Sequence, residues 1–525
     1  MTSYGRDNYG FSYEGGSGVV EEDTPSPAYK KRWSCCRVTL LMLGVLSASL
    51  GTAMLSGGYN AMFNAILKSQ MEIQPGSTSY DIWHYTPVPL YLRFYFYNFT
   101  NPDEFSKGGK AVLDEVGPYC YREYHEKQNL TFHPNNTVTF FQQRWWLWDQ
   151  GCSGNLSLDD IITSLNTVPI SAAWSVRNKP LMLTGLNSIL VSQKENSSPE
   201  PQYMRRFSMD TSVYVCVCLC LSQDPLLDWM QNNIVNITNI SNILPPGLTN
   251  YDKFGWFYNR NLSLTYDGLF NMFTGEDTLD HVGLIDLWDN GRNTTFFDYP
   301  CNKVTGSAGE IWPPGLKKDF IEFYSSDLCM SVKLFYKGEV TDVNGLPGYR
   351  YWGTNYTFAN GSVVEGNECY CVKGTCAPTG LLNAESCRMG SPAFISFPHF
   401  YAADPFLLDG VTGVSPPEAD KHAFTMDLIP ELGTPMWVSA RMQINMYVRP
   451  YPGKFKLGKI TILKDVPKVY LPLLWFEEVA GVPEDMASQL SLLLFIMKTP
   501  TMTIIFSIML ALGVLTILLA IFARC

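Results

Sequence analysis

Two apolar stretches near the ends of the 525-residue chain decide its fold: LLMLGVLSASLGTAML at residues 40–55 and TIIFSIMLALGVLTILLAIF at residues 503–522. No charged residue occurs from Val38 to Leu67 or from Thr499 to Phe522. A helix needs about 20 apolar residues to cross the hydrocarbon core of a bilayer. Both stretches satisfy this requirement, and the chain is therefore expected to be a membrane protein.

We expect transmembrane helices at residues 37–60 and 499–522. A cleaved signal peptide is the alternative for the first stretch. That stretch begins too far into the chain, and is too long, for the apolar region of a signal peptide. An uncleaved anchor is the favoured interpretation.

Basic residues and glycosylation motifs orient the chain. Lys30, Lys31, Arg32 and Arg37 precede or open the first span, and Arg524 follows the second. Positive charge is retained on the cytoplasmic side. The Asn-X-Ser/Thr acceptors all lie between the two spans, at Asn98, Asn129, Asn135, Asn155, Asn196, Asn236, Asn239, Asn261, Asn293, Asn355 and Asn360.

This pattern predicts cytoplasmic tails at residues 1–36 and 523–525 and one glycosylated ectodomain at residues 61–498. The composition, 46% hydrophobic and 17% charged, argues against extended disorder. A net charge of −11 makes nucleic acid an unsuitable partner.

The ectodomain sequence is dominated by short β-type runs. Examples are PLYLRFYFYNFT at 89–100 and TVTFFQQRWWLW at 137–148, which are bounded by Gly, Pro or Asn. Helical patterns are confined mainly to 157–194 and 225–245. We expect one α+β domain with a large antiparallel sheet and helices inserted at one end.

The 14 cysteines divide by compartment. Cys35, Cys36 and Cys525 adjoin the spans on the cytoplasmic side, where S-palmitoylation is expected and free thiols are the alternative. The other 11 lie in an oxidising compartment, where disulfides persist.

Six of the extracellular cysteines lie between residues 301 and 387, at Cys301, Cys329, Cys369, Cys371, Cys376 and Cys387. The spacing of Cys369, Cys371 and Cys376 also suits zinc, but the compartment and the absence of a nearby histidine in the sequence favour disulfides. Six cysteines allow 15 pairings, so the spacing alone does not choose among them.

Several short motifs occur in a specific order. They include NFTNPDEF (98–105), EVGPYCYRE (115–123), LNTVPISAAW (165–174), FISFPHFYAADP (394–405) and LPLLWFEE (471–478). Together with the two-span arrangement, they resemble the class B scavenger receptor family, whose members include fatty-acid translocase, the lysosomal integral membrane protein and croquemort. The resemblance extends over roughly residues 38–522.

The resemblance implies a fold and a set of disulfides. It predicts an antiparallel β-barrel-like core, an apical helical cluster and an internal hydrophobic tunnel. The family's six-cysteine pattern implies the pairs Cys301–Cys369, Cys329–Cys387 and Cys371–Cys376. The partners of Cys120 and Cys152 are left open.

The function implied by the resemblance is that of a cell-surface scavenger receptor. It would bind lipids or lipoproteins, and other anionic ligands, and transfer lipid toward the bilayer through the tunnel. Long-chain fatty acids, sterol esters and phospholipids are the expected ligands, and no cofactor or metal is expected. An endolysosomal membrane receptor for lipid export or protein sorting is the alternative within the family.

The resemblance also suggests ligand-binding residues. Lys194, in GLNSILVSQKENSS (185–198), matches a lysine of the family's apical ligand-binding helix. Arg205 and Arg206 are weaker candidates, and a solvated surface lysine is the alternative interpretation of Lys194.

Two other classes of function share the two-span arrangement. An ecto-enzyme would need clustered catalytic or metal-binding side chains, whereas the histidines are scattered in the sequence, at His84, His125, His133, His281, His399 and His422. We expect no enzyme activity, and a structural role for His399. A two-span ligand-gated channel would need polar pore-lining positions, and the second span offers only Thr501, Thr503, Ser507 and Thr516.

Small residues on the two spans permit close helix packing. They are Gly44, Ala48 and Gly51 on the first span, and Ala511 and Gly513 on the second. The sequence leaves open whether they serve the intramolecular helix pair or a homo-oligomer.

The stretch VYVCVCLCLSQ (213–223) fits none of these assignments, because Cys216, Cys218 and Cys220 have no evident role. It is too short for a membrane anchor, and as a metal site it lacks histidine. Alternating Val-Cys codons and a Leu-Ser-Gln end suggest that part of the stretch before Asp224 is a retained intron. Sequencing the transcript across this point tests that hypothesis.

Overall fold

The computed structural model describes residues 35–196, 204–208, 257, 260–388, 390–454, 457–497 and 499–522. The chain divides into two compact units. The first comprises residues 1–60 and 499–525, and the second comprises residues 61–498.

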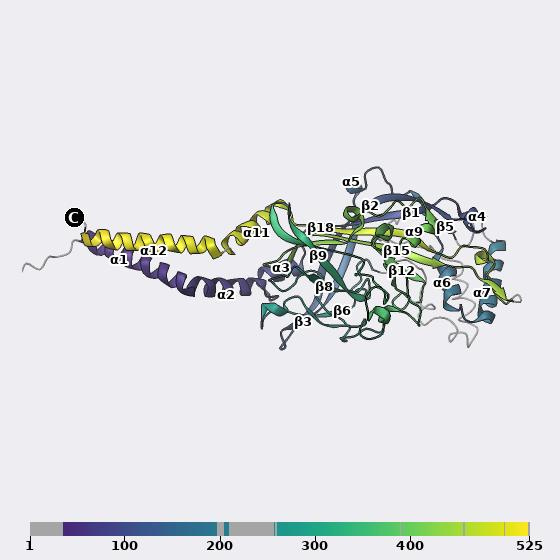
Figure 1. The fold of residues 1–525 in the computed structure, drawn as a ribbon, viewed down its shortest axis with the longest axis horizontal. Helices are drawn as coiled ribbons and strands as arrows, with labels where there is room; N and C mark the ends of the chain where they lie inside the picture. The colour runs from purple at the N-terminus through teal and green to yellow at the C-terminus, as the bar shows by residue number, and fades with distance from the viewer. Residues whose placement is uncertain are drawn as a thin grey trace, which may run out of the picture. The chain divides into compact units, whose positions relative to one another are not determined.

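The first unit is built from the two apolar stretches. Helix α1 (Cys35–Ala53) continues through a π-helical turn, η1 (Met54–Gly58), into α2 (Tyr59–Met71), and α12 (Thr499–Phe522) forms the second long helix (Figure 1). Within the described ranges, Cys35–Met71 and Thr501–Phe522 are the segments long and apolar enough to cross a membrane.

Helices α1 and α12 pack through small residues. A Cβ atom on Gly513 would lie 2.5 Å from the backbone nitrogen of Ala48, and one on Gly44 would lie 2.7 Å from Oγ1 of Thr516. Neither position has room for a larger side chain. The small residues of the two spans therefore pack the intramolecular helix pair.

The second unit is organised by a 14-stranded sheet with the order β7-β6-β3-β2-β1-β18-β15-β14-β10-β9-β8, to which β11, β12 and β13 add at the side. The strands of this sheet are β1 (Leu90–Phe99), β2 (Ala111–His133), β3 (Thr137–Trp148), β6 (Leu269–Phe273), β7 (Ile285–Trp288), β8 (Phe320–Ser325), β9 (Met330–Val343), β10 (Leu346–Trp352), β11 (Leu382–Asn383), β12 (Ala393–Ser396), β13 (Val411–Thr412), β14 (Thr425–Ile429), β15 (Thr434–Val448) and β18 (Val469–Gly481).

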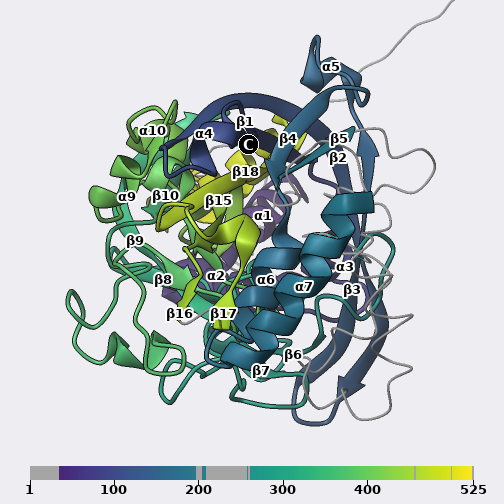
Figure 2. The same ribbon diagram turned by 90° about the vertical axis from the view of Figure 1, so that its right-hand side faces the viewer.

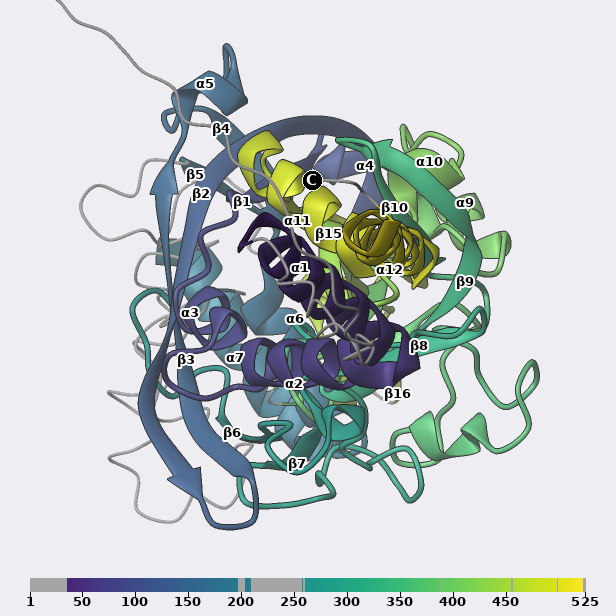
Figure 3. The same cartoon turned by 90° about the vertical axis from the view of Figure 1, so that its left-hand side faces the viewer.

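The sheet curves into a nearly closed barrel. Strands β2 and β3 lie on one side and β9 and β10 on the other (Figure 3). Its two edges approach each other at Ser307, which bridges to Leu284, next to β7, and to Phe323 of β8. This arrangement confirms the expected α+β class with a barrel-like antiparallel core.

Short helices surround the sheet. They are α3 (Thr78–His84), α4 (Pro102–Phe105), α5 (Gln150–Ser153), α6 (Thr167–Ser175), α7 (Pro180–Asn196), α9 (Phe406–Asp409), α10 (Ala419–His422) and α11 (Glu484–Met497), with 3-10 turns η4 (Leu279–His281), η5 (Asn367–Tyr370), η6 (Pro398–Phe400) and η7 (Thr461–Leu463).

Helices α6 and α7 lie side by side at one end of the second unit (Figure 2). Two hydrogen bonds tie α7 to the hairpin β16 (Pro452–Lys454)–β17 (Leu457–Lys459) and to the start of η7. Gly458 N donates to Thr184 Oγ1 at 2.9 Å, and Thr461 N donates to Asn187 Oδ1 at 2.6 Å.

The helical pattern expected over 157–194 is partly wrong. Residues Ile161–Leu165 form strand β4, which pairs with β5 (Met204–Ser208). The β-branched residues Ile161, Ile162 and Thr163 favour an extended strand, since branching at Cβ restricts the side chain in a helix. The second expected helical region, 225–245, lies outside the described residues.

Among the described residues of the second unit, four disulfides link separate segments. The structure joins Cys301 to Cys369, Cys329 to Cys387 and Cys371 to Cys376, the pairs that the family resemblance implies. A fourth bridge joins Cys120 of β2 to Cys152 of α5. Cys216, Cys218 and Cys220 lie outside the described residues.

Candidate functional site

The inward face of the sheet encloses a cavity of about 590 Å³. This volume lies in the range of about 300–1,000 Å³ usual for small-ligand pockets. Successive side chains of a strand point to opposite faces of its sheet, so every second residue lines the cavity. On β15 these residues are Val438, Ala440 and Met442, and on β18 they include Phe476 and Ala480.

Two helical segments also contribute apolar side chains to the cavity. Phe63, Ile66 and Leu67 come from α2, and Leu490 and Leu493 come from α11. These five residues belong to the second unit. Phe63, Ile66 and Leu67 lie near the end of the candidate span Cys35–Met71, and Leu490 and Leu493 precede the span Thr501–Phe522. The cavity is therefore lined in part by residues within or next to the candidate membrane-spanning segments.

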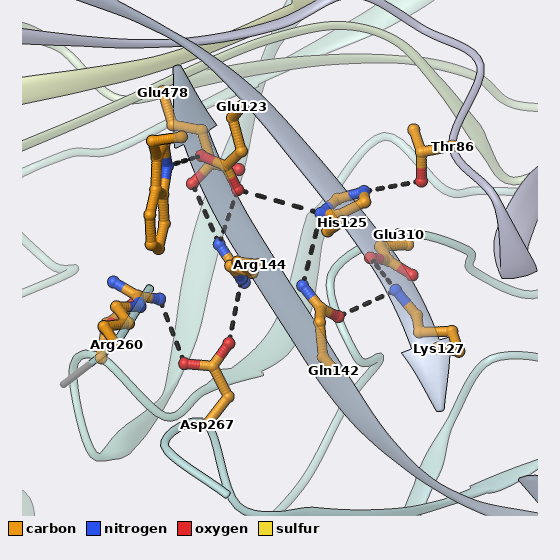
Figure 4. Close-up of polar contacts among 12 residues, drawn as sticks. Thr86, Glu123, His125, Lys127, Gln142, Arg144, Arg260, Asp267, Glu310 and Glu478 are labelled. Carbon is orange, nitrogen blue, oxygen red and sulfur yellow. Dashed lines mark hydrogen bonds and ion pairs between the residues drawn. The ribbon is translucent and has the colours of Figure 1, made fainter. Parts of the chain in front are cut away.

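A polar strip interrupts the apolar lining on β2 and β3 (Figure 4). It arises because the residues at alternate positions on the inward faces of these strands are polar: Glu123, His125 and Lys127 on β2, and Gln142 and Arg144 on β3. The two strands pair with Glu123 beside Trp146 and His125 beside Arg144. One wall of an otherwise apolar cavity thus carries charged side chains.

Arg144 is the centre of this strip (Figure 4). Its Nε lies 2.9 Å from Asp267 Oδ2, and its Nη1 lies 3.2 Å from Glu123 Oε1 and 3.7 Å from Glu478 Oε2. Burial opposes the charge of Arg144, but the surrounding carboxylates outweigh that cost and hold its pKa well above the usual value. One guanidinium therefore serves three acidic side chains.

The network extends on both sides of Arg144. Arg260 pairs with Asp267 at 3.1 Å and with Asp327 at 2.8 Å. Glu123 also accepts a hydrogen bond from the indole of Trp146 at 2.9 Å. Partners at hydrogen-bond distance offset part of the cost of burying these charges.

A second branch of the strip is centred on Lys127, which is fully buried. Its ammonium donates to Gln142 Oε1 at 2.8 Å and to Glu310 Oε1 at 2.6 Å. Burial lowers the pKa of Lys127, and the Glu310 carboxylate opposes that shift.

His125 lies between the two branches of the strip (Figure 4). Its Nε2 is 2.6 Å from Thr86 Oγ1, and its Nδ1 is 3.4 Å from Gln142. Burial, together with the cations Lys127 and Arg144, keeps the pKa of His125 well below its usual value. His125 is therefore a neutral imidazole at physiological pH.

Glu478 of β18 has one ion-pair partner among the described residues, Arg144, at the long distance of 3.7 Å. Its side chain is 29% exposed and lines the cavity. Burial, with the nearby Glu123 carboxylate, raises the pKa of Glu478 to about 7, although Arg144 and Arg260 oppose the shift.

His399 occupies a separate buried cluster. Its Nε2 lies 2.6 Å from Glu115 Oε2, its Nδ1 lies 2.9 Å from the carbonyl oxygen of Ser415, and its ring stacks on His422 at 3.9 Å between centroids. Both ring nitrogens have protein partners, as a structural histidine requires. Burial and His399 lower the pKa of His422 to about 4.

The predicted ligand-binding residues belong to a helix and a strand of the second unit. Lys194 belongs to α7, and Arg205 and Arg206 belong to β5, opposite Ser164 and Thr163. Their side chains lie outside the described part of the chain. Whether they bind ligands stays a prediction.

The glycosylation motifs differ in exposure. Asn129, Asn135, Asn155, Asn293 and Asn355 are exposed. Asn98, Asn261 and Asn360 are partly exposed, and each side chain makes hydrogen bonds within the protein. Asn236, Asn239 and the side chain of Asn196 lie outside the described residues.

The palmitoylation candidates Cys35 and Cys36 are exposed free cysteines at the start of α1, and Cys525 is outside the described residues. Across the ranges that the structure describes, no group of three or more His, Cys, Asp or Glu side chains is arranged to hold a metal ion.

The polar strip was not identified from the sequence. Its signal was available in CYREYHEKQ (120–128), where Glu123, His125 and Lys127 alternate with other residues of a strand-like run. Such alternation usually indicates a solvent-facing strand surface. Only the closure of the sheet turns this face inward.

Comparisons with known proteins agree with the motif pattern. The sequence profile described as the CD36 family matches residues 42–524. Protein peste of Drosophila melanogaster is 32% identical over 87% of this chain and 78% of its own length. Scavenger receptor class B member 1 of Sus scrofa is 33% identical, covering 83% of this chain and 79% of its own length.

Lysosome membrane protein 2 of Mus musculus is 29% identical over 91% of this chain and 93% of its own length. The similarity of all three relatives extends over most of both chains.

Proposed function

Because the chain belongs to the CD36 family, we propose that it is a scavenger receptor that binds lipid in the cavity of its second unit. The receptor would take lipids or lipoproteins from outside the cell and pass lipid toward the bilayer. It would act by binding and transfer rather than as an enzyme.

The observation that carries the proposal is the apolar cavity of about 590 Å³. An apolar cavity excludes water and favours an apolar occupant, because burying hydrocarbon surface is worth about 25 cal/mol per Å². The contribution of Phe63 and Ile66, on one side, and Leu490 and Leu493, on the other, supports a route toward the membrane. Phe63 and Ile66 lie within the first candidate span, and Leu490 and Leu493 shortly precede the second.

The proposed role of Lys194 is to capture ligands before they enter the cavity. A lysine on the helical cluster of α6 and α7 would attract anionic ligands or lipoproteins by charge. A Lys194→Glu change would weaken this capture and leave the cavity intact.

The proposed location is the plasma membrane, with both tails in the cytoplasm. The endolysosomal membrane is the alternative location, because one relative is named lysosome membrane protein 2. Surface biotinylation of cells that express the full chain tests the proposal, since recovery of an endolysosomal pool alone would contradict it.

Lipid binding is tested by filling the cavity. Ala440 lines it from β15, and Ala440→Phe would place a ring in the space that a ligand needs. The matched control is Val363→Phe, because Val363 is a 40% exposed surface residue.

The measurement is mass spectrometry of lipids that co-purify with the full chain from cells, together with uptake of labelled lipid. We expect Ala440→Phe to lower both severalfold and Val363→Phe to change neither. An unchanged lipid load in a folded Ala440→Phe protein would contradict binding in this cavity. An unchanged load in Lys194→Glu would remove only Lys194 from the proposal.

A further inference from the structure

Glu478 is a carboxyl group on the inward face of β18, and its neighbours on the strands are apolar. Along its own strand, Phe476 and Ala480 face the cavity on either side of it. Across the sheet it is opposite Leu92 of β1 and Ala440 of β15. Packing would be satisfied by an apolar residue here, so the carboxyl group calls for another explanation.

The contacts of Glu478 within the protein are few. Over the described ranges, the charged group within ion-pair distance is Arg144, whose Nη1 lies 3.7 Å from Oε2, and no protein hydrogen bond reaches the carboxyl group. The side chain is nevertheless 29% exposed and lines the cavity, and Figure 4 shows its carboxyl group beside Arg144. A polar group that the protein leaves unbonded is available to hydrogen-bond a ligand.

The charges that surround Glu478 determine which ligand group suits it. The cations of the cluster are Arg144, Arg260 and Arg388, and the anions other than Glu478 are Glu123, Asp267 and Asp327. These six charges balance, and the neighbouring His125 is neutral. An ionised Glu478 leaves the cluster with one excess negative charge.

A ligand carboxylate would meet this same excess. Arg144 is already shared by Glu123 and Asp267, so a third anion gains little from it and is repelled by both. An uncharged oxygen pays no such repulsion. It can accept hydrogen bonds from Arg144 and from a neutral Glu478, and burial and Glu123 raise the pKa of Glu478 so that the neutral form is populated near pH 7.

We propose that Glu478 and Arg144 form a polar subsite in the cavity wall that binds an uncharged oxygen of a lipid, a hydroxyl or an ester carbonyl, in preference to a carboxylate. The subsite rests on the proposed function, since it requires a lipid in the cavity. Glu478 is the specificity-determining residue: its neutral carboxyl group donates a hydrogen bond to the ligand oxygen, while Arg144 both holds the carboxyl group and donates.

The test compares two probes of equal chain length, oleyl alcohol and oleate. Their equilibrium binding to the full-length, detergent-solubilised protein is measured at pH 7.4. The variants are Glu478→Gln, which keeps an uncharged donor, and Glu478→Leu, which removes it. The matched control is Glu365→Leu, because Glu365 is exposed on the surface.

We expect the wild-type protein to bind oleyl alcohol more tightly than oleate. Glu478→Leu should weaken oleyl alcohol binding by about five- to tenfold, the effect of one lost hydrogen bond. Glu478→Gln should retain the preference for the alcohol, and Glu365→Leu should behave as wild type.

The outcomes separate this proposal from the proposed function. Tighter binding of oleate by the wild type, or unchanged oleyl alcohol affinity in Glu478→Leu, overturns the subsite but leaves lipid binding in place. Binding of neither probe by the wild type overturns the proposed function itself. If Glu478→Leu fails to fold, the wild-type preference and its retention in Glu478→Gln decide the matter.

Discussion

At the scale of single residues, the cavity wall depends on Arg144. This guanidinium, whose side chain is 18% exposed, compensates the buried carboxylates of Glu123 and Asp267 and reaches the partly exposed Glu478. Removing one member of a buried charge network costs more than the network itself contributes, because the remaining charges lose their partner without regaining water.

We therefore predict that Arg144→Met destabilises the second unit by about 3–5 kcal/mol. This corresponds to a fall of a few degrees in the unfolding midpoint, measured by thermal denaturation of the purified full chain. The control is Arg292→Met. Arg292 is 70% exposed beside Asp286, and its loss should leave the midpoint unchanged. Equal midpoints for Arg144→Met and wild type would contradict the role of Arg144.

Glu478 has a testable pH dependence. The folded protein raises the pKa of Glu478 to about 7 from an ordinary value of 4.5, so between these values the folded state binds more protons than the unfolded state. Stability from this group is therefore lost as the pH rises from about 4.5 through 7.

Glu478→Gln removes this loss. We expect its unfolding midpoint to match that of wild type near pH 4.5 and to exceed it increasingly up to pH 8, as measured by denaturation over a pH series. Glu365→Gln, at an exposed position, should show a constant difference from wild type. A Glu478→Gln difference that is independent of pH would show that Glu478 titrates normally.

At the scale of elements, the packing of α1 against α12 depends on residues without side-chain bulk. A Cβ on Gly513 would approach the Ala48 nitrogen to 2.5 Å, closer than any contact that carbon and nitrogen allow. The hydroxyl of Ser47 also donates to the carbonyl oxygen of Met509 across the pair, at 3.0 Å.

We predict that Gly513→Leu separates the two helices. The measurement is cross-linking of Ser47→Cys to Met509→Cys by a short bismaleimide in membranes, followed by proteolysis of the ectodomain and a reducing gel. Gly513→Leu should lower the yield of linked fragments severalfold. The control, Val514→Leu, changes a residue that is 45% exposed on α12, and it should leave the yield unchanged. A full yield with Gly513→Leu would show that the helices tolerate a larger separation.

The first helical stretch also shows where an element ends. Gly57 adopts φ 112° inside the π-helical turn between α1 and α2. Few residues other than glycine reach this conformation without strain. The uncharged run from Val38 to Leu67 is therefore not one regular helix, although composition alone suggested an uninterrupted apolar segment.

At the scale of the whole molecule, the sequence predicted what depends on local pattern. The two long apolar helices follow from composition, and the antiparallel sheet follows from short alternating runs such as TVTFFQQRWWLW. The polar strip could not be predicted in this way. Arg144 of β3 and Glu478 of β18 come together although β2 and β1 lie between their strands in the curved sheet, and pairing between strands so distant in sequence leaves no local signal.

The strand β4 shows the same limit. The sequence pattern predicts a helix at residues 161–165, but these residues form a strand that pairs with β5. The sequence indicated Lys194 on α7 as a ligand-binding candidate, whereas the charged side chains of the cavity wall lie on β2, β3 and β18. A charged residue can be read from a sequence, but its position on the inward face of a nearly closed sheet cannot.

The two sheet edges meet at Ser307, and this affects how densely copies of the protein can be packed in a membrane. Ser307 N donates to Glu322 O, and Ser307 O accepts from Tyr324 N. On the β7 side, Gly306 O accepts from Ile285 N, and Ala308 N donates to Gly283 O. Backbone groups that an open sheet would offer to a neighbouring molecule are thus used within the chain. A receptor crowded with its own copies in a membrane patch gains from this, because intermolecular strand addition, the first step toward aggregation, finds less unpaired backbone to begin from.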